Sequence, residues 1–145
     1  MTRPSIGSVY LARLADGMAA LRRFADSYRR HPAGIAHELI IAYKGFERDD
    51  QLQEARAVFH GLPHRALELE DSGFDIGSYL ETSRRVAHDY LCFLNTHTEI
   101  AATGWLAALA RHAVREQVGV AGAMGSYESL QESVSLLREV LWRCV

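Results

Sequence analysis

The sequence predicts an α/β fold of three layers, with a mostly parallel sheet of about five strands and helices on both faces. Short apolar runs rich in β-branched and aromatic residues alternate with longer segments whose apolar residues recur at helical spacing. The runs are almost continuously apolar, as in strands that are covered on both faces. The 145 residues fit a single domain, spanning residues 1–145.

The first half of the chain gives three strands and two helices. Predicted strands cover residues 8–12, 38–43 and 65–69, and the helices between them cover 18–28 and 52–59. Pro32 ends the first helix, because proline disfavours helical geometry in the residue before it. Pro63 follows the second helix in the same way.

The second half continues the alternation. A helix is predicted from Ile76 to Ala87, and a buried strand over residues 90–94. A helical stripe over 105–114, a fifth strand over 118–122 and a last amphipathic helix over 130–141 complete the order. Each strand–helix–strand connection is expected to be right-handed.

Composition excludes several classes of protein. The net charge of -2 provides no basic field for nucleic acid, so no nucleic-acid partner is expected. Cys92 and Cys144 form no CxxC pair, so no zinc or redox motif is present. The first residues lack a signal-peptide apolar region, and no stretch reaches the length of a transmembrane segment. We therefore expect a cytoplasmic protein.

Ligands of open parallel sheets bind beyond the carboxyl ends of the strands. Polar residues or glycines follow all five predicted strands there, over residues 13–16, 44–47, 70–77, 95–99 and 122–128. The sequence has no dinucleotide motif after its first strand, no GxxxxGK[ST] phosphate loop and no GxSxG elbow. A dehydrogenase, an NTPase and a serine hydrolase are therefore disfavoured.

The loop before the third helix contains Gly73, Asp75 and Gly77. Glycines let the backbone approach a ligand closely, and a helix N-terminus favours a phosphate. The alternative is that Asp75 simply caps the helix.

After the fourth strand, Asn95, His97 and Glu99 alternate along the chain. In extended backbone all three side chains would lie on one side, where they could hold a divalent cation or a sugar hydroxyl. Mn²⁺ tolerates imidazole better than Mg²⁺ does. The alternative is a hydrogen-bonded turn in which Thr96 and Thr98 satisfy the backbone.

Five segments together resemble the nucleotide-binding half of an A-type glycosyltransferase, close to glycosyltransferase family 2. The resemblance covers residues 8 to about 127. It rests on segments 9–17, 43–46, 72–78, 94–106 and 118–122. Within the third segment, Gly73-Phe74-Asp75-Ile76-Gly77 also resembles glycan proteins related to rhamnan synthesis.

That resemblance implies a nucleotide-diphospho-sugar donor and a glycan or lipid-linked acceptor. Asp75, Gly73, Lys44 and Asn95 would contact the sugar nucleotide. His97, Asn95 and Glu99 would stand at the position of the Mn²⁺ or Mg²⁺ ion. The family carries acids in the second loop and an Asp-x-Asp pair after the fourth strand, whereas this chain has Lys44, Asn95 and His97. No catalytic base is identified.

The chain ends soon after the fifth predicted strand, where the family usually continues into an acceptor-binding half. Either the sequence is a fragment, or a partner supplies that half, or the chain no longer catalyses transfer. The alternative is a non-catalytic binding or interaction module that kept the scaffold and lost the metal-binding acids. The apolar stripe of the last predicted helix, with Trp142, either covers the sheet or forms a homodimer interface.

Overall fold

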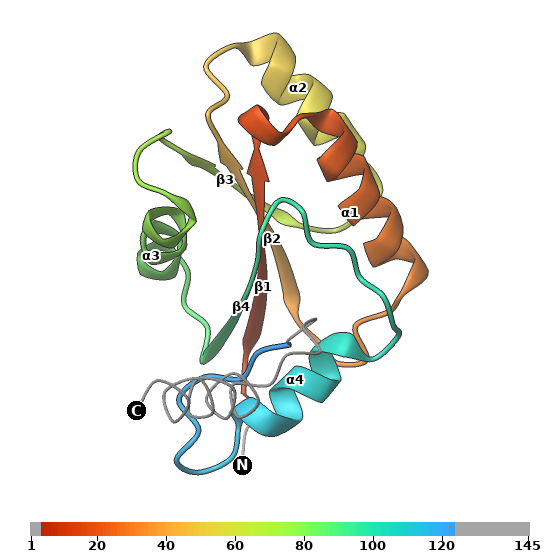
Figure 1. Cartoon of the computed structure of the whole chain (residues 1–145), viewed down its shortest axis with the longest axis vertical. Coiled ribbons are helices and arrows are strands. Elements are labelled where there is room, and N and C mark those ends of the chain that lie inside the picture. The colour runs from red at the N-terminus through yellow and green to blue at the C-terminus, as the bar shows by residue number, and fades with distance from the viewer. Residues whose placement is uncertain (1–3, 124–145) are drawn as a thin grey trace, which may run out of the picture.

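The computed structural model describes residues 4–123. Figure 1 shows a central sheet with helices on both sides of it. The elements in chain order are β1 (Ile6–Arg13), a 3-10 turn η1 (Leu14–Asp16), α1 (Met18–Arg30), β2 (Glu38–Lys44), α2 (Asp49–Val58), β3 (Arg65–Leu69), α3 (Asp75–Arg85), β4 (Tyr90–Leu94) and α4 (Trp105–Ala113).

All strand pairs of the sheet are parallel, and the strand order is β3-β2-β1-β4. The predicted three-layer α/β class is therefore confirmed, with four strands in the described part of the chain. β1 lies in the middle and is buried almost throughout its length, which explains why its sequence is so continuously apolar. The register places Arg13 beside Lys44, so both strands end in a basic residue at the same edge.

Alternate residues of the strands face opposite layers. One face, which includes Tyr10 and Tyr43, packs against α1 and α2. The rings of Tyr10 and Phe24 stack at a centroid distance of 3.6 Å with an angle of 2° between their planes. The other face, which includes Val9 and Leu11, packs against residues around α3. Helices therefore cover both faces of the sheet.

Helix α4 lies near the amino end of the sheet rather than over either of its faces (Figure 1). Its Leu106 packs in a small cluster with Ile6, at the start of β1, and Ala33. The amide of Gly104 donates a hydrogen bond of 2.8 Å to the Pro32 carbonyl, which fixes the start of α4 against the loop before β2.

The predicted fifth strand over residues 118–122 is wrong. This segment pairs with no strand in the described structure, and the side chain of Val120 is 89% exposed. Gly119 and Gly122 have no side chains that could pack against neighbouring strands, and glycine weakens a strand interior. The apolar β-branched residues of the segment are therefore not sufficient to make it a strand of the sheet.

The predicted helix over 130–141 and most of the 122–128 loop lie outside the described residues. The same holds for the homodimer interface predicted on that helix. Among the helices that the structure describes, none is long and apolar enough to cross a membrane.

Candidate functional site

The strand order creates a topological switch point between β1 and β4. The chain leaves β1 toward α1 and β2, whereas β4 lies on the opposite side of β1. The loops that follow the two strands therefore diverge at the carboxyl edge, and open α/β sheets bind ligands in such crevices. Here the two loops are η1, with Asp16, and the segment from Asn95 to Glu99.

Two buried hydrogen bonds fix the segment after β4 onto β1. The Thr96 hydroxyl donates to the Leu11 carbonyl at 2.8 Å, and the Tyr10 hydroxyl donates to the Thr96 carbonyl at 2.8 Å. Thr96 is 3% exposed. Burial raises the pKa of the Tyr10 hydroxyl well above its ordinary value, so it stays a proton donor over the whole physiological range.

Asn95 organises the turn that follows. Its side-chain oxygen accepts hydrogen bonds from the His97 amide at 3.0 Å and from the Thr98 hydroxyl at 3.2 Å. The Thr98 amide donates to the Asn95 carbonyl at 3.0 Å. This arrangement matches the hydrogen-bonded turn that the sequence left open as an alternative.

His97 reaches the loop after β1. Its Nε2 lies 3.5 Å from Oδ1 of Asp16, and the two side chains are 64% and 22% exposed. A carboxylate and an imidazole therefore stand together at the mouth of the switch point, each with one polar edge accessible to a ligand.

The three residues predicted to hold a metal do not converge. Glu99 turns toward α1, where its carboxylate lies 3.6 Å from Nη2 of Arg30, and the Asn95 oxygen is used within its own turn. No group of three His, Cys, Asp or Glu side chains suited to a metal ion occurs in residues 4–123. These residues do not fit a divalent cation. The involvement of Mn²⁺ or Mg²⁺ stays an untested prediction.

The two basic residues at the ends of β1 and β2 have different surroundings. Lys44 is 1% exposed; its Nζ donates to the Gly73 carbonyl and lies 3.9 Å from Oδ1 of Asp71. Arg13 is partly exposed, yet its Nε is buried without a hydrogen-bond partner in the described structure. Of Lys44 and Arg13, Arg13 is therefore the cation that is available to bind a ligand.

Asp75 is the first residue of α3, but it makes no side-chain capping bond. Its negative charge favours the positive end of the helix. Burial raises the pKa of Tyr79, one turn further on, to about 12, and the Asp75 charge adds to this shift. Asp75 and Gly73 thus lie on the α3 side of the sheet, away from the turn formed by Asn95 and His97. Their predicted contacts with a sugar nucleotide remain untested.

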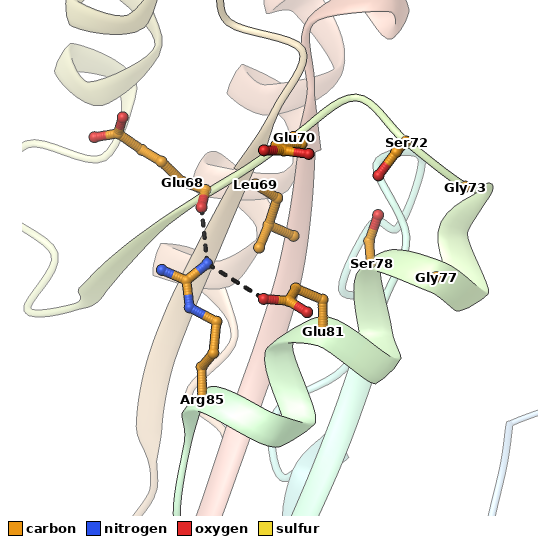
Figure 2. A pocket seen from close by; sticks show the side chains of 9 residues that line it. All are labelled: Glu68, Leu69, Glu70, Ser72, Gly73, Gly77, Ser78, Glu81 and Arg85. Atoms are coloured by element: carbon orange, nitrogen blue, oxygen red, sulfur yellow. Dashed lines mark hydrogen bonds and ion pairs between the residues drawn. The ribbon is translucent and has the colours of Figure 1, made fainter.

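A pocket of about 500 Å³ opens between β3 and α3. Figure 2 shows that Glu70 and Ser72 from the loop after β3 face Ser78 and Glu81 from α3. Arg85 closes the lower side, where it donates to the Glu68 carbonyl at 2.9 Å and lies 4.0 Å from the Glu81 carboxylate.

Comparisons with known proteins give little outside the fold. No family model matches the chain, and no curated protein matches it. Among solved structures it is similar to protein Rv1636 from Mycobacterium tuberculosis H37Rv, at 18% identity and a TM-score of 0.36. The match covers 87% of this chain and 99% of that protein. At this distance, nothing about ligands or activity is transferred from Rv1636.

The glycosyltransferase resemblance, with its rhamnan-synthesis variant, is wrong. No family model and no curated protein of that family matches the chain. In the described structure the predicted fifth strand is not formed, and the residues at the expected metal position point apart.

The sequence places the loop from Arg13 to Asp16 at the ligand edge but does not identify either residue as part of a site. Asp16 becomes a candidate only through its contact with His97, which lies far away in the chain. The sequence does contain one indication for Arg13, because it is a charged residue that directly ends a buried strand.

Proposed function

We propose that the chain is a binding domain for a phosphorylated ligand of the nucleotide class. The ligand would lie at the carboxyl edge of the sheet, over the switch point between β1 and β4. The observation that carries the proposal is Arg13, whose Nε is buried without a partner at this edge. The proposal is of binding and includes no transfer reaction.

A guanidinium that is partly withdrawn from water and left without an acceptor is costly. Nothing within the described structure forms an ion pair with Arg13, whereas its neighbour Lys44 already has the Gly73 carbonyl and Asp71. Phosphate oxygens match the planar fork of donors on arginine and form charge-assisted hydrogen bonds with it. A bound phosphate would therefore satisfy Arg13.

Two polar side chains at the same edge suit the rest of such a ligand. Asp16 can accept hydrogen bonds from ribose hydroxyls, a role that carboxylates at the ligand edge take in other doubly wound folds. His97, 3.5 Å from Asp16, can donate or accept at the same place. A nucleoside phosphate offers both an anion for Arg13 and hydroxyls for Asp16.

Isothermal titration calorimetry with AMP, ADP and ATP, without added metal, tests the proposal. We expect binding by the full chain and roughly tenfold or greater weakening in Arg13→Gln, because one charged hydrogen-bonding partner is lost. Arg84→Gln is the matched control, since Arg84 is an exposed arginine on α3. Inorganic phosphate in a parallel titration shows whether the nucleoside contributes.

Two results would overturn the proposal. One is the absence of heat from all three nucleotides with a folded sample. The other is equal affinity of the wild type and Arg13→Gln, since a phosphate held elsewhere would not depend on this residue.

A further inference from the structure

We propose a second ligand site, for an aliphatic primary amine, in the pocket between β3 and α3. The pocket of about 500 Å³ is larger than a single ion requires. Neither Arg13 nor Asp16 nor His97 lines it, so it is separate from the site proposed for the nucleotide. Four of its polar side chains carry the assignment: Glu70, Ser72, Ser78 and Glu81 (Figure 2).

Ser78 provides the observation that points to a ligand. It is 3% exposed, and its hydroxyl has no hydrogen-bond partner in the described structure. Figure 2 shows this hydroxyl directed toward Ser72, across the upper part of the pocket. A buried polar group without a partner costs free energy, and a ligand that bonds to it recovers that cost.

The carboxylates around Ser78 determine the charge that a ligand in this pocket should carry. Glu81 has one cation near it, Arg85, at the long distance of 4.0 Å. Glu70 is exposed and forms no ion pair within residues 4–123. Glu68 does not contribute, because its carboxylate is paired with Arg56 at 2.5 Å and points away from the pocket in Figure 2. The groups left free are therefore mainly acceptors with a surplus of negative charge.

A primary ammonium group matches this set. It has three donors and no acceptor, so it can donate to the Ser78 hydroxyl and to a carboxylate of the same pocket, Glu81 or Glu70. A metal ion fits less well, because the described residues contain no group of three metal-ligating side chains. The remaining volume can hold an aliphatic chain against Leu69, which also lines the pocket.

Titration with 1,4-diaminobutane, followed by ¹H–¹⁵N NMR of the full chain, tests the site. We expect saturable shifts concentrated between Ser72 and Glu81, with 1,4-butanediol of the same length producing none. Ser78→Ala and Glu81→Gln should each weaken binding several-fold. Ser83→Ala is the control, because the Ser83 hydroxyl lies on the same helix and donates to the Leu80 carbonyl.

Weaker binding by Ser78→Ala would not result from loss of folded protein. Removing an unsatisfied hydroxyl should leave this variant at least as stable as the wild type. Shifts that do not saturate, equal binding by Ser78→Ala and the wild type, or an equal response to the diol would each overturn the amine assignment. None of these results concerns Arg13, so the two proposals are tested independently of each other.

Discussion

Lys44, the one lysine of the sequence, donates a hydrogen bond from its buried ammonium to the carbonyl oxygen of Gly73. The bond joins the end of β2 to the loop that begins α3. Because Gly73 lines the pocket between β3 and α3, Lys44 sets the position of one wall of that pocket. Its charge is balanced by Asp71 at 3.9 Å.

Lys44→Met should loosen the start of α3 without unfolding the chain. The substitution leaves the Gly73 carbonyl without its donor, but the Asp71 carboxylate is half exposed, so we expect a loss of about 1–2 kcal/mol in the free energy of unfolding. Amide hydrogen exchange in the first turn of α3 should become roughly tenfold faster. Arg84→Met, which removes an exposed cation from the same helix, should leave this exchange rate unchanged. A large global loss in Lys44→Met would contradict the role assigned to Lys44.

Gly34→Ala should be clearly more destabilising than Gly61→Ala. Both glycines have φ near +79°, so both substitutions carry the left-handed strain of about 1 kcal/mol. A Cβ on Gly61 meets nothing within 4 Å, whereas a Cβ on Gly34 would lie 2.8 Å from the backbone of Gly104. We expect the clash to add about 1–3 kcal/mol. Urea unfolding of the two variants measures the difference, and equal losses would mean that the loop before β2 does not touch α4 as described.

Tyr10→Phe and Thr96→Val should each lower the free energy of unfolding by about 1 kcal/mol, because each leaves a buried carbonyl without its donor. The two bonds fix the same loop, so the double variant should lose less than the sum of the single losses. Chemical denaturation of all four proteins completes the cycle. Tyr90→Phe, at a partly exposed tyrosine of β4, serves as control and should change stability little. Strict additivity would show that the two bonds act independently.

The sequence was sufficient for the fold because its signals are local. The apolar runs and helical stripes mark nearly every element that the structure describes, and β-α-β alternation implies a parallel sheet. Local pattern cannot show whether a strand finds a partner. Residues 118–122 have β-branched side chains but no place in the sheet.

The candidate site was harder to predict, for a similar reason. Alternation of Asn95, His97 and Glu99 predicted one shared face in extended backbone, but the bond from Thr98 to the Asn95 carbonyl turns the chain instead. The partners of these residues come from distant segments, as Asp16 and Arg30 do. An unpaired Arg13 Nε or Ser78 hydroxyl cannot be recognised at all until the surrounding atoms are placed.

Cys92 should make stability fall with rising pH above about pH 9. Burial in β4 raises the pKa of its thiol to about 11, whereas the unfolded chain ionises near its ordinary value of 9.0. The folded state therefore holds the proton more tightly. Its contribution to the free energy of unfolding is complete below pH 9 and is lost as the pH rises toward 11. Between pH 8 and pH 10.5 this loss amounts to ~2 kcal/mol.

The experiment compares the wild type with Cys92→Ala by urea unfolding at both pH values. Both proteins retain Cys144, and both retain Tyr43 and Tyr79, whose pKa values of about 12 affect the two proteins equally. The wild type should lose ~2 kcal/mol more than Cys92→Ala over this interval, because only the wild type has the Cys92 thiol. Identical losses would show that the Cys92 thiol is solvated in the folded chain.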